Sequence, residues 1–311
     1  MEYIDLHLHS CFSDGTDSPD LLVRKAKSAG IGMIALTDHN TLAGIDDFRA
    51  ACRRYSQTGI DGVELSCAWP EKDPASLPPG TEPPEIHVLG YFPPDSDFSM
   101  PCFQPLHGII RDYRLRKIRH NEAIVRKMQD AGITGRKDKD LTETGGVRAV
   151  TVEGFRAFAR SLSSSGNYNR VHIARYLEDL GVVSSIKEAM DHYIGKKCPY
   201  YVTRETITVR EAIEAIHAAG GTAVIAHLGE YHLEGDRLEA FFAYCMEHGA
   251  DGFELLHPHN TPRTAGSILA FARRVRRETG HVLLLTAGSD YHGANKENRQ
   301  ALPWLPPYAW D

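Results

Sequence analysis

Two histidines separated by one residue, His7 and His9, lie near the start of the chain in YIDLHLHSCFSDGT (residues 3–16), and Asp14 follows them. Imidazole nitrogens and carboxylate oxygens are common ligands of divalent metal ions that activate water for hydrolysis. An H-x-H pair alone is weak evidence, because a strand histidine is more often an ordinary core or surface residue. The interpretation of these side chains therefore depends on partners elsewhere in the chain.

Further ligand-type side chains occur in or directly after other apolar segments, namely ALTDHN, GVELS, IHVLGYF, TAVIAH and GSDYH. The candidate ligand set comprises six histidines and three carboxylates: His7, His9, Asp14, His39, Glu64, His87, His227, Asp290 and His292. This set suits two or three divalent ions bridged by a carboxylate and a hydroxide. Because it lacks cysteine, it favours manganese, with iron or zinc as alternatives, in a hydrolytic role over a structural zinc site.

These side chains need a scaffold that brings together residues almost 300 positions apart. Short apolar, β-branched segments predict seven buried strands, at 2–9, 32–37, 62–66, 86–92, 222–227, 252–257 and 281–289. Helix signals separate most of them, including Ser18-Pro19, Thr41, the capping box TVRE at 208–211, and the segments 236–248 and 263–278. Alternating strands and helices predict an α/β fold with a mostly parallel sheet, closed or nearly closed into a barrel.

A barrel would also place the ligands together. In the first strand, the side-chain period of two puts Asp5, His7 and His9 on one face, while Leu6 and Leu8 point into packing. The carboxyl ends of parallel strands meet at one face of a barrel, where barrel active sites are built. Ionisable groups at several strand ends are costly to bury without partners, so the combined pattern predicts a metal site.

The alternation of strands and helices breaks between about residues 100 and 200. GIIRDYRLRKIRHNEAIVRKMQDAG (108–132) predicts a long basic amphipathic helix, and two more helices are expected around 170–194. We therefore predict a barrel made of residues 1–100 and 200–311 with a helical insertion at 101–199. The proline-rich segment 68–85 predicts a long surface loop.

Composition narrows the functional classes. The formal net charge of −6 argues against a broad basic surface for duplex nucleic acid, but it is compatible with a small phosphorylated substrate in a cationic pocket. No apolar run approaches the length of a membrane span, and no secretory leader precedes the first strand. The six cysteines are scattered and are expected to be free thiols. The free thiols and the lack of a membrane span or leader together predict a cytoplasmic protein.

The order of six motifs resembles that of a known family. DLHLHSCFSDGT, ALTDHN, GVELS, IHVLGYF, IAH and GSDYHG together resemble the PHP (polymerase and histidinol phosphatase) family, and more closely its stand-alone metal-dependent phosphoesterase branch. The resemblance covers about 1–92 and 200–293, and residues 169–195 look like the inserted helical segment of that branch. It implies a distorted seven-stranded β/α (TIM-like) barrel, two or three metal ions, and an insertion that covers the active site.

The resemblance also implies a division of the ligands. One ion would be held by His7, His9, Glu64 and Asp290; a second by Glu64, His87 and His227; and a third by Asp14, His39 and His292. A metal-bridging hydroxide would attack phosphorus. The general acid stays open between Asp38 and Asp290, so Asp38, Glu64 and Asp290 form the candidate catalytic set.

A phosphate group needs cations besides the metals. Arg170, in NRVHIAR, is the first candidate for a phosphate clamp, because a guanidinium matches phosphate geometry, and Arg175 and Lys197 are further candidates. His257 and His259, in LLHPHN, either line the pocket or are polar residues at the barrel rim. The chain departs from the family in reading AHL at 226–228, where AHP is usual.

The leading hypothesis is a metal-dependent phosphoesterase that releases phosphate from a small metabolite, first the 3′-phosphate of a nucleoside 3′,5′-bisphosphate or a short oligonucleotide. The alternative is a cyclic phosphodiesterase that opens a cyclic sugar phosphate and then releases phosphate. A histidinol-phosphate-type phosphatase and a non-catalytic binding module are lesser alternatives. An amidohydrolase predicts a lysine at a strand end as a bridging carbamate, and none of the seven expected strands ends in lysine.

Overall fold

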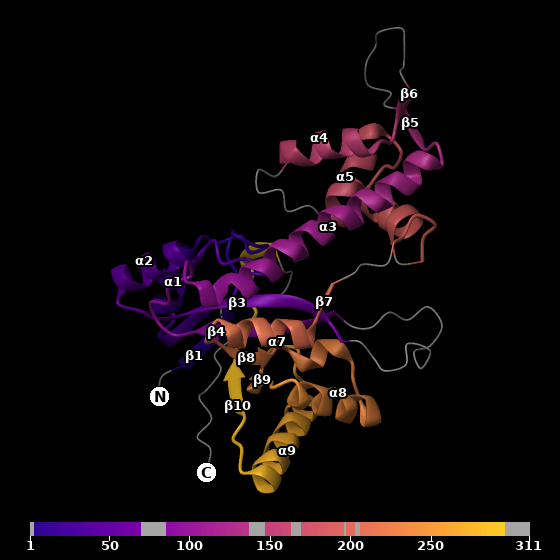
Figure 1. Cartoon of the computed structure of the whole chain (residues 1–311). Coiled ribbons are helices and arrows are strands. Elements are labelled where there is room, and N and C mark those ends of the chain that lie inside the picture. The colour runs from indigo at the N-terminus through magenta and orange to yellow at the C-terminus, as the bar shows by residue number, and fades with distance from the viewer. Residues whose placement is uncertain are drawn as a thin grey trace. The chain divides into compact units, whose positions relative to one another are not determined.

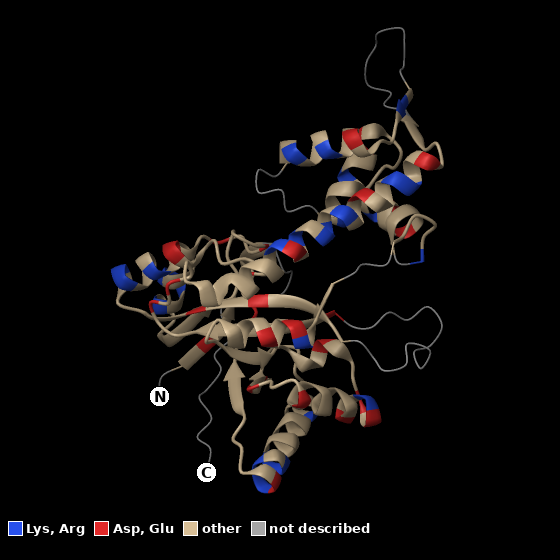
Figure 2. Ribbon diagram, in the orientation of Figure 1, with Lys and Arg blue, Asp and Glu red and all other residues tan. Residues whose placement is uncertain are grey.

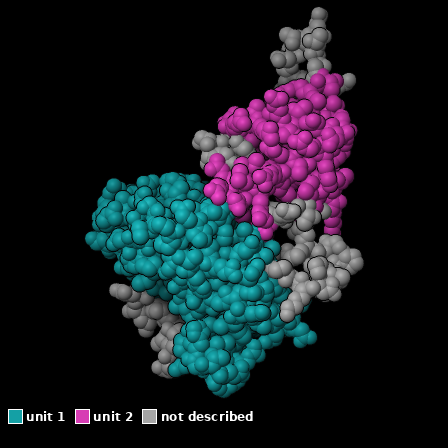
Figure 3. Space-filling model, viewed as in Figure 1, with its two compact units in different colours: residues 1–110, 207–311 teal, residues 111–206 magenta. Residues whose placement is uncertain are grey.

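The computed structural model describes residues 3–69, 85–136, 147–162, 169–195, 197–202 and 206–295 (Figure 1). The chain divides into two compact units (Figure 3). Unit 1 comprises residues 1–110 and 207–311, and unit 2 comprises residues 111–206. Each unit has a hydrophobic core of its own. None of the helices in the described part of the chain combines the length and apolarity that crossing a bilayer requires.

Unit 1 is built on one curled sheet. The path through it is β1 (Tyr3–Leu8), β2 (Ile31–Leu36), β3 (Thr58–Ala68), β4 (Glu85–Phe92), β8 (Thr222–Ile225), β9 (Gly252–Leu256) and β10 (Leu284–Ala287), with β7 (Ile207–Thr208) pairing with the end of β3. The two ends of the path approach each other, because Leu8 bridges Tyr291 and the His9 N–H donates to the Tyr291 carbonyl at 2.9 Å. The predicted α/β, barrel-like fold is confirmed, and β7 adds a short strand to the expected seven.

The direction of β4 differs from the mostly parallel pattern that was expected. This strand runs antiparallel to both β3 and β8. Parallel neighbours need a long crossover, whereas antiparallel strands can be joined by a loop, and no helix was expected between β3 and β4. The reversal pairs His87, near the start of β4, with Ser66 in the second half of β3. His87 therefore lies at the edge where the parallel strands end. The predicted proline-rich loop at 68–85 falls largely on residues 70–84, which lie outside the described part of the chain.

Helices follow most strands of unit 1. They are α1 (Pro19–Ser28), α2 (Ile45–Tyr55), α7 (Val209–Ala218), α8 (Gly235–Glu247) and α9 (Pro262–Thr279), with the short turns η2 (Pro101–Phe103), η4 (Leu228–Tyr231) and η5 (Gly293–Asn295). The start signals predicted at Ser18-Pro19 and at residues 208–211 are confirmed, but the one predicted at Thr41 is wrong, because α2 begins at Ile45 after Gly44 and has no side-chain cap. The Ser18 hydroxyl accepts the Leu21 N–H ahead of Pro19, and Thr208 with Glu211 forms a reciprocal capping box.

The strand period separates two faces of the sheet. Val63 and Leu65 of β3 lie in the core that packs with α7, α8 and α9, and Glu64 between them points to the opposite face. Val88 of β4 belongs to the same core, and His87 next to it again alternates away. The ligand-type side chains thus occupy the face of the sheet turned away from these helices.

Unit 2 is mainly helical. It contains most of α3 (Gln104–Asp130), the hairpin β5–β6 (Thr134–Arg136 and Val147–Ala149), α4 (Val152–Leu162), α5 (Arg170–Leu180), α6 (Ile186–Ala189) and η3 (Met190–Ile194). Its core joins Ile124, Phe155, Ile173 and Leu177. Figure 2 shows lysine and arginine along α3, in line with the basic helix expected there. The hairpin and α4 were not predicted from the sequence.

Candidate metal centre

Glu64 is the carboxylate around which the predicted ligands gather. Its Oε2 lies 3.3 Å from Nε2 of His7, 3.2 Å from Nε2 of His9 and 2.9 Å from Nδ1 of His39. The Glu64 side chain is fully buried. His7 lies in β1, His9 directly follows this strand, and His39 lies in the segment after β2, so two neighbouring strands direct imidazoles at one oxygen.

The other oxygen of Glu64 faces a different pair of histidines. Oε1 lies 2.8 Å from Nδ1 of His87 and 3.0 Å from Nε2 of His227. His87 belongs to β4, and His227 follows β8 with φ at +22°, in the left-handed region. Because each oxygen has its own imidazoles, Glu64 has the geometry of a carboxylate that bridges two cations.

Asp290 completes the group around β1. Its Oδ1 lies 3.1 Å from Nε2 of His9 and 3.6 Å from Nε2 of His7. Asp290 also has a positive φ, of +51°, just after β10. One ligand atom from each of His7, His9, Glu64 and Asp290 lies within 4.8 Å of all the others. The structure therefore brings together the four residues that the resemblance assigned to one ion.

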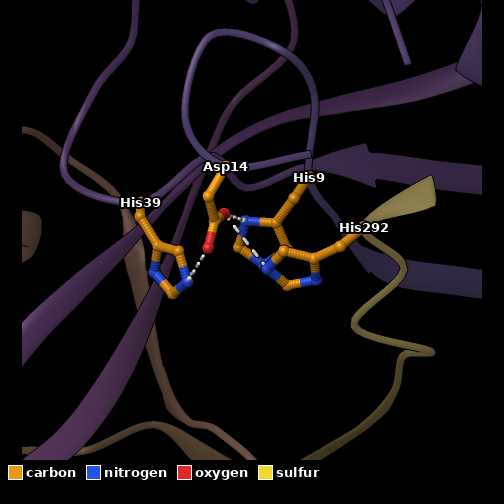
Figure 4. Close-up of side chains that lie close together, drawn as sticks. All are labelled: His9, Asp14, His39 and His292. Atoms are coloured by element: carbon orange, nitrogen blue, oxygen red, sulfur yellow. Dashed lines mark ion pairs between the residues drawn. The ribbon is translucent and has the colours of Figure 1, made fainter. Parts of the chain in front are cut away.

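A second group forms where Asp14 approaches the barrel edge (Figure 4). Its Oδ1 lies 3.1 Å from Nε2 of His292 and 4.0 Å from Nδ1 of His9, and its Oδ2 lies 3.9 Å from Nε2 of His39. Figure 4 shows the carboxylate between His39 on one side and His9 and His292 on the other. The Asp14 side chain is 56% exposed, so the site opens to solvent at this end.

Asp38 holds the loop that carries Asp14. Its Oδ1 accepts the Ser10 N–H at 2.7 Å and the Ser13 hydroxyl at 2.5 Å, and its Oδ2 accepts the Ser10 hydroxyl at 2.6 Å. With both oxygens bonded, Asp38 fixes the loop against the end of β2. These contacts are those of a positioning residue, and the catalytic role suggested for Asp38 stays a prediction.

The donor set fits divalent metal ions. Nε2 of His7, Nε2 of His9 and Oε2 of Glu64 are buried and have no hydrogen-bond partner among the residues that the structure describes. Leaving such atoms unpaired costs about 1–3 kcal/mol each. In His292, Nδ1 donates to the Asp290 carbonyl at 2.8 Å, so the neutral ring presents the lone pair of Nε2 to the site. Nitrogen and oxygen donors without sulfur suit manganese, iron or zinc.

Glu254 of β9 was missed by the sequence reasoning. Its Oε1 accepts a hydrogen bond from Nδ1 of His7 at 3.0 Å, and its Oε2 accepts the backbone N–H of His227 at 2.8 Å. In the neutral ring that metal binding requires, this bond keeps the proton on Nδ1 and leaves the lone pair of Nε2 turned toward Glu64. The available signal was an acidic residue inside the apolar run GFELL, where an unpaired charge would be costly.

A model of the PHP domain family matches residues 5–248, a span that includes His7, His9, Glu64, His87 and His227. The chain belongs to the PHP domain family. The predicted resemblance is confirmed.

Relatives that are matched over most of their length agree with this assignment. This PHP chain is 29% identical over 303 residues to the 5′-3′ exoribonuclease Rnm of Escherichia coli, covering 97% of this chain and 86% of that protein. It is 27% identical over 299 residues to the 3′,5′-nucleoside bisphosphate phosphatase of Chromobacterium violaceum, covering 96% and 90%. A solved structure from Bifidobacterium adolescentis, described as a candidate metal-dependent phosphoesterase, has a TM-score of 0.65 and 26% identity, covering 97% and 92%. The PHP protein is thus a phosphoesterase, a metal-dependent hydrolase of phosphate esters.

The predicted substrate-binding residues fall in both units. In unit 2, the Arg170 guanidinium lies 6.0 Å from the ring centre of Tyr201, and Arg175 and Lys197 are exposed. In unit 1, His257 is buried directly after β9, and His259 is half exposed and paired with Glu230. Substrate binding by these five residues stays a prediction.

Charges in the PHP site set the protonation of its histidines. Burial alone lowers the pKa of His9, but the carboxylates of Asp290 and Glu64 beside its ring outweigh this effect and raise the pKa to about 9. Burial of His87 is outweighed by the Glu64 charge, which raises its pKa to about 10. Burial lowers the pKa of His39 and His227. The metal-free site therefore mixes protonated and neutral imidazoles.

Metal binding is expected to release protons near pH 7.5. His9 and His87 are charged there in the metal-free protein and must become neutral to bind an ion. Their raised pKa values stabilise the metal-free fold fully below about pH 6.5, and this contribution is lost as the pH rises through about 9 to 10. Calorimetric titration with Mn²⁺ in two buffers of different ionisation enthalpy should show release of about one or more protons per chain. Identical heats in both buffers would contradict the protonation of these histidines.

Proposed function

We propose that this PHP protein removes the 3′-phosphate of a nucleoside 3′,5′-bisphosphate or a short oligonucleotide. The observation that carries the proposal is the gathering of histidines on both oxygens of the buried Glu64. The similarity to a 3′,5′-nucleoside bisphosphate phosphatase over 96% of the chain supports a nucleotide as substrate. The acidic net charge of −6 favours a small or single-stranded substrate over duplex nucleic acid.

The proposed roles follow from the contacts. Bound divalent ions would activate water for attack at phosphorus and offset the charge on the phosphoryl oxygens. His7, His9, Glu64 and Asp290 would hold one ion, with Glu64 shared by a second position at His87 and His227. A third position would be formed by Asp14, His39 and His292. Arg170 and Arg175 are the proposed contacts to substrate phosphate, since a guanidinium can bind two phosphate oxygens at once.

A second candidate function is the stepwise removal of nucleotides from the 5′ end of RNA. It is favoured by the 29% identity to a 5′-3′ exoribonuclease over 97% of the chain. Both reactions hydrolyse a phosphate ester of a nucleotide, so the same metal centre could serve either one. The two differ in the product, which is inorganic phosphate in the first case and mononucleotides in the second.

The test is a substrate panel with the Mn²⁺-loaded protein. The panel contains adenosine 3′,5′-bisphosphate, 3′-AMP, 5′-AMP, a ribose cyclic phosphate, histidinol phosphate and a 5′-phosphorylated RNA oligonucleotide. Among these substrates, we expect the highest kcat/KM for phosphate release from adenosine 3′,5′-bisphosphate. His7→Ala should lower this kcat/KM by more than about 1,000-fold. His281→Ala, at an exposed histidine before β10, is the matched control. The proposal fails if no ester releases phosphate or mononucleotides and His7→Ala behaves like the wild type.

A further inference from the structure

β9 provides none of the nine proposed metal ligands, but its end lies against the site. His257 directly follows the strand and is only 4% exposed. The centre of its ring lies 5.2 Å from that of His227 and 6.1 Å from that of His7. A histidine in this place could be a further metal ligand, a general acid or a positioning residue, and its hydrogen bonds distinguish these roles.

The orientation of His257 is fixed by the turn that follows β9. The Asn260 N–H donates to the His257 carbonyl at 2.9 Å. The side-chain Nδ2 of Asn260 donates to the Glu254 carbonyl at 2.8 Å, and the side-chain Oδ1 accepts the Gly229 N–H at 2.8 Å. The His257 ring is therefore carried by a bonded turn rather than by a free loop.

One hydrogen bond defines the tautomer of His257. Its Nδ1 accepts the backbone N–H of His259 at 3.0 Å, so Nδ1 has no proton. The single proton of the neutral ring is then on Nε2. An N–H nitrogen cannot bind a metal ion, and a neutral imidazole does not give up its remaining proton as a general acid. His257 is thereby left as a hydrogen-bond donor.

The donor faces a proposed ligand. Nε2 of His257 is buried and has no hydrogen-bond partner in the described part of the chain, and Oδ2 of Asp290 lies 3.7 Å away. The other oxygen of the same carboxylate, Oδ1, faces Nε2 of His9 at 3.1 Å. A small rotation of Asp290 would bring Oδ2 into hydrogen-bond range of His257 while Oδ1 stays with the ligands of β1.

We propose that β9 supplies the outer hydrogen bonds of the metal centre, with Glu254 orienting His7 and His257 orienting Asp290. Both are positioning residues and neither is a ligand. With Oδ2 bonded to His257, Asp290 offers a metal ion only Oδ1. The proposal rests on the proposed function in taking this ion to be one used in hydrolysis. Removing such partners typically weakens metal binding or activity by about 10–100-fold.

The experiment compares His257→Gln with His257→Leu. The glutamine amide can place an N–H close to the position of Nε2, whereas leucine has a comparable volume and no donor. Metal content is measured at saturating Mn²⁺, and the Mn²⁺ dissociation constants are measured by competition with a chelator. We expect both variants to hold the same number of ions as the wild type. His257→Leu should weaken the binding of one Mn²⁺ ion by about 10–100-fold, and His257→Gln should recover most of this affinity. His281→Leu is the control on an exposed histidine.

A second measurement does not depend on the variants. The ¹⁵N shifts of His257 in the metal-free wild-type protein should report a protonated Nε2 and an unprotonated Nδ1. The proposal is overturned by loss of one whole ion in both variants, by unchanged dissociation constants in His257→Leu, or by a protonated Nδ1. If the wild type hydrolyses no phosphate ester, the proposed function fails, while the ion count and the ¹⁵N shifts still decide the role of His257.

Discussion

Replacing Glu64 with glutamine is expected to lower kcat by more than about 1,000-fold and to reduce the bound metal content. The substitution hardly changes the volume of the side chain, so β3 should keep its packing, with Val63 and Leu65 in the core on the opposite face. Its charge and one of its two acceptor oxygens are lost, however. Oε2 faces His9 at 3.2 Å and Oε1 faces His87 at 2.8 Å, so an amide presents an N–H group to one of these histidines. A neutral amide cannot bridge two cations.

The measurement combines phosphate release from adenosine 3′,5′-bisphosphate with metal analysis of the same samples. Glu247→Gln is the matched control, because Glu247 is exposed at the end of α8 and its substitution makes the same chemical change outside the site. We expect the control to keep wild-type metal content and kcat. If Glu64→Gln retained its metal and lost less than about 10-fold in kcat, the central position of Glu64 would be wrong.

Local sequence signals were sufficient where the structure depends on local interactions. The capping box at Thr208 and Glu211 is made within one turn, so its residues alone predict the start of α7. The alternation of Asp5 and His7 with Leu6 and Leu8 is a property of the strand itself, and all of these residues are at least nine-tenths buried. Buried strands and helix starts could therefore be predicted without knowledge of the fold.

Features set by distant residues could not be predicted in this way. The direction of β4 depends on its pairing with β3 and β8, and the short strands β5 and β6 carry too few residues to show a period. The role of Glu254 becomes visible only when His7, 247 positions away, lies 3.0 Å from it. The tautomer of His257 likewise depends on a turn whose geometry its residue types do not define.

The groupings of the metal ligands came from the family resemblance rather than from spacing. The structure is consistent with them, since His7, His9, Glu64 and Asp290 converge, as do Asp14, His39 and His292. It also adds that His9 faces both groups, with Nε2 3.1 Å from Asp290 and Nδ1 4.0 Å from Asp14. The two groups are thus adjacent through one imidazole, and a change at His9 should affect both.

Gly288→Ala is expected to disrupt the metal centre although it removes no ligand. A Cβ at position 288, between β10 and Asp290, would lie 2.3 Å from Cβ of His7 and 2.4 Å from Oε1 of Glu254. These two residues share the hydrogen bond that orients His7, and the Gly288 N–H donates to the Leu256 carbonyl at 3.0 Å. The added methyl group must therefore separate β1, β9 and the segment after β10, or break the bond between His7 and Glu254. Overpacking of this kind costs about 1–3 kcal/mol.

The measured quantities are the unfolding temperature of the metal-free protein and the Mn²⁺ dissociation constant. We expect Gly288→Ala to unfold a few degrees lower and to bind at least one ion about 10-fold or more weakly. Gly266→Ala is the matched control, because Gly266 lies inside α9, where an added Cβ would have no described atom within 4 Å apart from its chain neighbours and the backbone of its own helix. In that helix, alanine should raise the free energy of unfolding by about 0.5–1 kcal/mol relative to glycine. The same methyl group thus has opposite effects at the two positions. Wild-type stability and metal affinity in Gly288→Ala would show that β1, β9 and β10 do not enclose His7 as tightly as described.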